Sequence, residues 1–135
     1  MEYGQSVMIK ILVVDDHAIV RESLCRFLAG QEDMDVVASA TDGLTGLVLL
    51  KDGLKVNIVL TDLNMPLMDG MELTREVVAI DQSPPVIVLT FHPLTAVKQN
   101  VLNAGAKACL SKYGELDELL SAIRSVHAAY GNRVA

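Results

Sequence analysis

Val56 to Gly70 read VNIVLTDLNMPLMDG, and this segment is the strongest single indication of the fold. Its apolar run, Ile58 to Leu60, is continuous rather than alternating, which is typical of a strand buried on both faces of a parallel sheet. The strand ends on Asp62, and Pro66 and the Asp69-Gly70 pair then turn the chain away. Open α/β sheets bind ligands at the edge where their parallel strands end. The stretch therefore places a carboxylate at that edge, although a lone strand-end aspartate is more often a turn or capping residue.

Strand-like and helix-like segments alternate along the whole chain. Each short apolar run is followed by apolar residues at helical spacing. The predicted strands span residues 10–14, 34–40, 56–62, 86–90 and 106–110. The predicted helices run from His17 to near Gly30, from Asp42 through Leu50, across Leu73 to Ile80, across Leu94 to Gly105, and from Glu115 to Ala129. Five βα units with short loops imply right-handed crossovers and a doubly wound α/β fold, with helices on both faces of a parallel sheet.

Composition limits the class of protein. The 135 residues are 51% apolar but only 4% aromatic, so one domain with an aliphatic core is expected. No apolar run approaches the roughly 20 residues of a membrane span, and the N-terminus lacks signal-peptide character, which predicts a cytoplasmic protein without membrane contact. Cys25 and Cys109 show no metal-type spacing. The net charge of −6 should repel phosphate backbones, so no nucleic acid is expected to bind this domain alone.

The carboxyl ends of the predicted strands carry side chains that suggest chemistry. These are Asp15 and Asp16 after the first strand, Asp62 after the third, Thr90 after the fourth and Lys112 after the fifth. Three carboxylates at one edge repel one another, and a divalent cation that prefers oxygen, best fitted by Mg²⁺, relieves the repulsion. Magnesium, an amine and a hydroxyl all bind phosphoryl oxygens. We therefore expect Asp62 to be a nucleophile that forms an acyl phosphate, with Thr90 and Lys112 on the phosphoryl oxygens.

In their order along the chain, these residues resemble the receiver domain of two-component response regulators. The resemblance runs from about Ile9 to Ala129 and rests on Asp15-Asp16, Asp62-Leu63-Asn64-Met65-Pro66, Asp69-Gly70, Thr90, Ala104-Gly105-Ala106 and Lys112. It implies a flavodoxin-like (βα)5 fold with strand order 2-1-3-4-5. We accordingly divide the chain into a flexible N-terminus (1–8), a receiver domain (9–130) and the start of a linker or tail (131–135).

The resemblance also implies roles for individual residues. Asp62 would accept a phosphoryl group from a phosphohistidine on a sensor histidine kinase or phosphotransfer protein. Thr90 and Lys112 would hold that group and report its presence. The implied cofactor is Mg²⁺, with Mn²⁺ as a substitute. The implied metal ligands are the side chains of Asp16 and Asp62, the backbone carbonyl of Asn64 and, through water, Asp15.

Two segments, 86–92 and 118–126, look most like the NarL/FixJ (LuxR-type) branch of the family, whose receivers precede a helix-turn-helix domain. This likeness implies a transcription regulator that contacts DNA through a C-terminal domain missing from this chain. The family also dimerises, and the resemblance implies a homodimer through the fourth helix, fifth strand and fifth helix.

The chain departs from the family pattern at its switch residue. Three residues before the lysine, the family usually has Tyr or Phe, and this chain has Cys109. We therefore expect the usual aromatic switch to be absent or to be displaced onto Phe91 or Tyr113. We also expect the bulky Phe91 to slow the approach of water or small phosphodonors. Asn64 and His92, each two positions beyond a key residue, are expected to flank the attacking water and to tune dephosphorylation.

Two other functions fit part of the pattern. Phosphohydrolases of the haloacid dehalogenase type also form an aspartyl phosphate beside Mg²⁺, but they need an acid where this chain has Asn64. A receiver-like interaction module that is never phosphorylated would keep the fold and leave the acids unused. We therefore predict a phosphoacceptor signalling domain rather than an enzyme with multiple turnover. His17, His92 and His127 share no metal-type spacing and are expected to be ordinary surface or packing residues.

Overall fold

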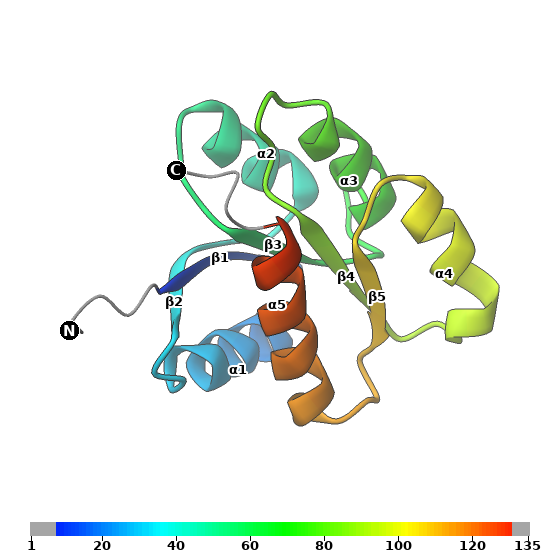
Figure 1. Ribbon diagram of the computed structural model, residues 1–135. Coiled ribbons are helices and arrows are strands. Elements are labelled where there is room, and N and C mark those ends of the chain that lie inside the picture. The colour runs from blue at the N-terminus through cyan, green and yellow to red at the C-terminus, as the bar shows by residue number, and fades with distance from the viewer. Residues whose placement is uncertain (1–7, 131–135) are drawn as a thin grey trace.

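The continuous apolar runs form a five-stranded parallel sheet in the computed structural model, which describes residues 8–130 (Figure 1). The strands are β1 (Ile9–Val14), β2 (Met34–Ala40), β3 (Ile58–Asp62), β4 (Val86–Thr90) and β5 (Ala108–Ser111). Their order is β2-β1-β3-β4-β5, and every neighbouring pair is parallel, which confirms the predicted flavodoxin-like fold. Strands β3 and β4 are buried along their whole length, and this explains why their sequences are apolar without alternation.

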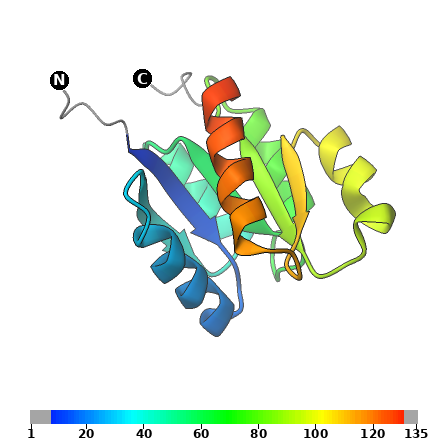
Figure 2. The same ribbon diagram turned by 60° about the horizontal axis from the view of Figure 1, so that its bottom comes forward.

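Five helices cover the sheet in two layers. They are α1 (Ala18–Ala29), α2 (Gly43–Lys51), α3 (Gly70–Val78), α4 (Leu94–Asn103) and α5 (Leu116–Tyr130). Helices α1 and α5 lie on one face of the sheet, and α2, α3 and α4 lie on the other (Figures 1 and 2). Side chains of β1 alternate between the two cores: Ile11 and Val13 pack on the side of α1 and α5, and Leu12 and Val14 on the opposite side.

Local signals in the sequence set where several helices begin and end. The Asp42 carboxylate accepts the backbone N–H of Thr45 at 2.7 Å and caps α2, as the sequence predicts. Asp69 caps α3 in the same way through the N–H of Glu72, at 2.8 Å. Gly105, just past the end of α4, has a φ of +117°, a conformation that favours glycine.

Some predicted boundaries shift in the structure. Strand β3 begins at Ile58 rather than at Val56, whereas β4 spans the predicted residues, and the Pro85 carbonyl before it accepts the N–H of Val59 at 3.0 Å. The last strand is Ala108–Ser111 instead of 106–110. Residues 1–7 and 131–135 lie outside the described residues, so the flexible N-terminus and the linker remain predictions. Among residues 8–130, no helix combines the length and the apolar composition that a membrane-spanning helix needs.

Candidate functional site

Asp62 lies at the carboxyl end of the central strand β3 and is only 6% exposed. One of its carboxylate oxygens accepts the backbone N–H of Leu63 at 2.8 Å. The start of α3 presses against the same strand end, because a Cβ atom at Gly70 would lie 2.2 Å from the backbone oxygen of Asp62. Only glycine therefore fits at this position, and its close approach holds the Asp62 backbone in place.

Lys112 connects two of the acids across the sheet edge. Its Nζ lies 2.8 Å from Asp15 Oδ2 and 3.1 Å from Asp62 Oδ1, and its side chain is only 4% exposed. The hydrogen bond to Asp15 joins residues 97 positions apart in the sequence. The backbone N–H of Lys112 donates to the Thr90 carbonyl at 2.8 Å, so β4 and β5 present their ends together. The structure thus brings together the strand-end residues that the sequence singled out.

The electrostatics of Asp62 reflect its burial. Desolvation raises the pKa of this carboxyl above its ordinary value, and the charge of the nearby Lys112 ammonium offsets part of that rise. Asp15 lies beside it and raises the pKa further, because two like charges disfavour each other. One lysine therefore faces a group of carboxylates that it does not neutralise, which favours the binding of an additional cation.

The acids that follow β1, together with the last residue of β3, could hold that cation. Ligand atoms of Asp15, Asp16, His17 and Asp62 all lie within 4.8 Å of one another. The Asp16 Oδ1 atom is shielded from solvent and has no hydrogen-bond partner among the described residues. An orphaned carboxylate oxygen in an acidic cluster fits a divalent cation. His17 is an exposed residue, as predicted, but its ring lies against these acids, a position that was not predicted from the sequence.

Thr90 and the residues that follow it form the far side of the site. Thr90 is fully buried, and its hydroxyl oxygen accepts the backbone N–H of His92 at 3.0 Å. The His92 ring nitrogen Nε2 lies 2.7 Å from Asn64 Oδ1, so these two side chains are hydrogen-bonded. The sequence predicted that both residues flank the site. It did not predict that they contact each other.

Two exposed aromatic rings lie beside Lys112. The centroids of Phe91 and Tyr113 are 5.1 Å apart at an interplanar angle of 53°, and the Lys112 Nζ lies 4.8 Å from the centre of the Phe91 ring. Phe91 is 45% exposed and Tyr113 80% exposed. Cys109, by contrast, is buried in the core on the side of α2, α3 and α4. Its thiol pKa is raised by that burial, which suits an inert packing residue.

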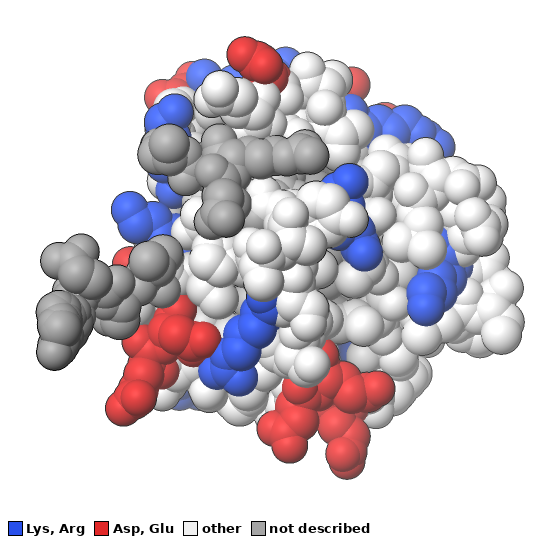
Figure 3. Space-filling model, in the orientation of Figure 1, with Lys and Arg blue, Asp and Glu red and all other residues white. Residues whose placement is uncertain are grey.

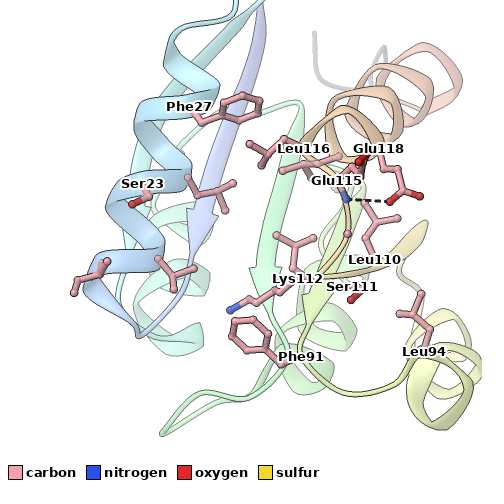
Figure 4. Close-up of a pocket in the computed structure, with 16 residues that line it drawn as sticks. Ser23, Phe27, Phe91, Leu94, Leu110, Ser111, Lys112, Glu115, Leu116 and Glu118 are labelled. Carbon is pink, nitrogen blue, oxygen red and sulfur yellow. Dashed lines mark hydrogen bonds between the residues drawn. The ribbon is translucent and has the colours of Figure 1, made fainter.

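An apolar cavity of about 420 Å³ opens between α1 and α5, next to the acidic cluster (Figure 4). Phe91 and Lys112 lie at one end of it, and Phe27 and Leu116 lie toward the other. Leu89 of β4 also lines the cavity. The cavity therefore exposes part of the sheet core directly beside the Lys112 side chain.

The strand order and the site at the carboxyl edge define a flavodoxin-like α/β domain whose acids and lysine suit phosphate chemistry. Residues 11–124 match the family model described as the response regulator receiver domain. The chain belongs to this family and is a receiver domain of two-component response regulators. It is most like the NarL/LuxR branch.

Relatives and solved structures agree with this assignment. The chain is 38% identical over 121 residues to the response regulator GacA of Pseudomonas aeruginosa, covering 90% of this chain and 56% of GacA. It is 37% identical over 118 residues to the transcriptional regulatory protein LiaR of Bacillus subtilis, covering 87% of this chain and 56% of LiaR. The chain thus spans about half the length of these curated relatives.

Solved structures of response regulators have the same fold as this chain. The signal receiver domain of the NarL response regulator from Mycobacterium tuberculosis superposes with a TM-score of 0.83 at 29% identity, over 90% of this chain and 98% of that one. A LuxR-family response regulator from Aurantimonas gives a TM-score of 0.84 at 31% identity, over 92% of this chain and 88% of that one.

Proposed function

We propose that Asp62 accepts a phosphoryl group from a phosphohistidine on a sensor histidine kinase or phosphotransfer protein, and that this transfer switches an output. The observation that carries the proposal is the Lys112 ammonium held between Asp15 and Asp62. A buried cation that contacts a strand-end carboxylate is suited to bind the oxygens of a phosphoryl group attached there.

The proposed phosphoryl transfer requires few groups. An oxygen of the Asp62 carboxylate attacks phosphorus, the new P–O bond forms as the P–N bond of the phosphohistidine breaks, and the electron pair of the P–N bond stays on the imidazole. Lys112 neutralises charge on the transferred oxygens, and the Thr90 hydroxyl, now accepting from His92, turns to donate to one of them. The domain is a signalling component, and apart from this self-catalysed transfer and later dephosphorylation we assign it no enzymatic turnover.

A divalent cation, Mg²⁺ or Mn²⁺, would supply further charge neutralisation at the same oxygens. Its proposed ligands are the side chains of Asp16 and Asp62 and the backbone carbonyl of Asn64, with Asp15 acting through water. The shielded, unpartnered oxygen of Asp16 supports this ligand set. Asp15 is engaged by Lys112, which fits an indirect role for its carboxylate.

We assign the switch to the aromatic pair rather than to Cys109. A buried thiol in the core has no ring to swing toward Thr90, whereas Phe91 follows Thr90 directly and contacts the Lys112 ammonium with its face. When Lys112 turns to a phosphoryl group, that contact is lost or reset. The Phe91–Tyr113 pair then reports the change at the molecular surface.

The hydrogen bond between His92 and Asn64 is proposed to set the lifetime of the phosphate. Asn64 lies two positions beyond Asp62 and His92 two positions beyond Thr90, so both would flank the path by which a water molecule approaches the phosphorus in line. While they bond to each other, Asn64 Oδ1 and His92 Nε2 are not available to orient that water. Loss of the bond should therefore change the rate of dephosphorylation.

We place kinase docking over the cavity between α1 and α5. The cavity is lined mainly by apolar residues and ends at Lys112, so a partner seated there brings its phosphohistidine to Asp62 (Figure 4). Acidic side chains gather at the N-terminal end of α5, including Asp117 and Glu118 (Figure 3). A partner that covers this end should present neutral or basic residues to it.

The output is proposed by analogy with the longer relatives, which are named as response regulators and a transcriptional regulatory protein. We propose a cytoplasmic transcription regulator that contacts DNA through a separate C-terminal helix-turn-helix domain. The acidic receiver itself, with a net charge of −6, is not suited to bind DNA. A homodimer through α4, β5 and α5 is the proposed assembly.

The test is intact mass spectrometry after incubation with acetyl phosphate and Mg²⁺. The wild type should gain one phosphoryl group, and Asp62→Asn should gain none. Asp81→Asn, which changes an exposed acid beyond α3, serves as the matched control and should label like the wild type. Equal labelling of the wild type and Asp62→Asn would reject the site. Steady release of product from p-nitrophenyl phosphate would favour a phosphohydrolase instead.

A further inference from the structure

His17 occupies the N-cap position of α1, but its side chain makes no capping hydrogen bond. The residue is held by its backbone, whose N–H donates to Asp15 Oδ1 at 2.9 Å and whose carbonyl accepts the N–H of Arg21 at 2.8 Å. The imidazole turns back toward the acids, with Nδ1 3.4 Å from Asp15 Oδ1 and 3.3 Å from Asp16 Oδ1. Within residues 8–130, the ring makes no hydrogen bond. Neither capping nor packing in the core explains its position.

The two distances are informative. Charge-assisted hydrogen bonds between nitrogen and a carboxylate are usually about 2.7–2.9 Å long, so 3.3 and 3.4 Å are too long for good ones. Two ligands at about 2.0–2.1 Å from one tetrahedral ion lie about 3.3 Å apart. Two neighbouring ligands of an octahedral Mg²⁺ at a similar distance lie about 3.0 Å apart. The separations therefore leave room for one divalent ion shared by the ring and the two carboxylates.

The oxygen that faces the ring is the one that lacks a partner. Asp16 Oδ1 is shielded from solvent and accepts no hydrogen bond from the described residues, and it is the same atom that lies 3.3 Å from His17 Nδ1. A cation bound between them would satisfy a lone pair on each. Imidazole nitrogen is a preferred ligand of zinc, nickel and copper, whereas Mg²⁺ prefers oxygen and water.

We propose that His17 is a metal-selectivity residue, which together with Asp15 and Asp16 lets this site bind a late first-row divalent ion of the zinc class. Such an ion would occupy the space that Mg²⁺ needs beside Asp62, because all four ligand groups lie within 4.8 Å of one another. The consequence of this binding for signalling rests on the proposed function. An ion held by His17 would compete with Mg²⁺ and prevent phosphotransfer to Asp62.

Metal binding to the unphosphorylated protein tests the inference. Zn²⁺ and Mg²⁺ are titrated separately by calorimetry into the wild type, His17→Asn and His127→Asn. Asparagine is a good N-cap residue, so α1 should keep its start, which circular dichroism checks. Loss of one ligand should weaken Zn²⁺ binding by about tenfold or more. Mg²⁺ binding should change much less, so that the ratio of the two affinities falls in His17→Asn and is unchanged in His127→Asn.

The visible spectrum of bound Co²⁺ gives a second readout, since removal of a nitrogen ligand should change its bands in His17→Asn alone. Equal Zn²⁺ affinity in the wild type and His17→Asn would overturn the inference. So would an equal loss of Zn²⁺ and Mg²⁺ affinity, because His17 would then support the whole site without selecting an ion. If Zn²⁺ binding depends on His17 but acetyl phosphate does not label Asp62, only the proposed function fails. If acetyl phosphate labels Asp62 but Zn²⁺ binding does not depend on His17, the inference about His17 is rejected and the proposed function stands.

Discussion

Replacement of Lys112 by methionine should destabilise the protein strongly at neutral pH in the absence of divalent cations. The substitution keeps much of the side-chain volume but removes the ammonium that lies 2.8 Å from Asp15 and 3.1 Å from Asp62. Removing one partner of a buried ion pair typically costs about 3–5 kcal/mol, because the remaining charge is left uncompensated. Asp15 and Asp62 each keep one backbone N–H as a partner, from His17 and Leu63 respectively. Because burial already raises the pKa of the Asp62 carboxyl, we expect this group to take up a proton when the ammonium is removed.

The stability lost in Lys112→Met has an upper limit that depends on pH. Asp62 can take up a proton instead of remaining as an unpaired carboxylate, and from an ordinary pKa of 3.8 this costs about 4 kcal/mol at pH 7. At pH 5 the same protonation costs only about 1.6 kcal/mol. In the variant, the native state then binds a proton that the unfolded chain has released, so its stability rises as pH falls. We expect a loss of about 3–4 kcal/mol at pH 7 and at most about 1.6 kcal/mol at pH 5.

Urea denaturation of the wild type and Lys112→Met at both pH values, in EDTA, measures these differences. Lys98→Met removes an exposed lysine of α4 and should change the free energy of unfolding little at either pH. Saturating Mg²⁺ should stabilise Lys112→Met more than the wild type, because the ion replaces part of the missing charge. A loss below about 1 kcal/mol at pH 7, or an equal loss at both pH values, would show that Lys112 does not compensate a buried carboxylate.

Three further predictions test other parts of the site. Gly70→Ala should lower the free energy of unfolding by about 3 kcal/mol in urea denaturation, because the new Cβ would lie 2.2 Å from the Asp62 backbone oxygen, whereas Gly30→Ala should be nearly neutral. Asp42→Ala should cost about 1 kcal/mol at pH 7 through loss of the α2 cap. A backbone N–H in the first turn of α2 holds the pKa of Asp42 below its ordinary 3.8, so its contribution is present above that pH and is lost as the pH falls through the lowered value. Denaturation at pH 7 and pH 3 should show the difference shrink. Phe91→Ala should raise the rate of labelling by acetyl phosphate severalfold in the mass assay, and an unchanged rate would argue against a ring that restricts small phosphodonors.

The sequence predicts the fold and the convergence of the site for the same reason. Parallel strands buried on both faces need continuous apolar runs, and their carboxyl ends must share an edge, so Asp15, Asp62 and Lys112 had to lie near one another. The periodicity of the helices then sets the layers. The apolar pattern does not fix where each strand starts. Strand β5, for example, begins at Ala108, after the chain has turned at Gly105.

Contacts between side chains were harder to predict, because they depend on rotamers and on the spacing of the helices. The hydrogen bond from His92 to Asn64 needs two loops to converge, and nothing in either loop's local sequence encodes the other. The cavity between α1 and α5 was also not predictable, because it depends on how far apart the two helices pack. His17 did carry a signal: it directly follows the Asp15-Asp16 pair at a strand end. A search for histidine pairs overlooks a single histidine placed beside acids.

Lys112 is the residue through which these parts would communicate. Its ammonium contacts Asp15 and Asp62 and lies over the ring of Phe91, which in turn packs against Tyr113. The ammonium is a single compact charge on one flexible side chain. If it moves toward a phosphoryl group on Asp62, its contacts with Asp15 and with the Phe91 ring must change as well. Phosphorylation and metal binding would therefore both reach the exposed ring pair through one side chain. In this chain, where Cys109 has no ring to move, the proposed route would take the place of an inward aromatic switch.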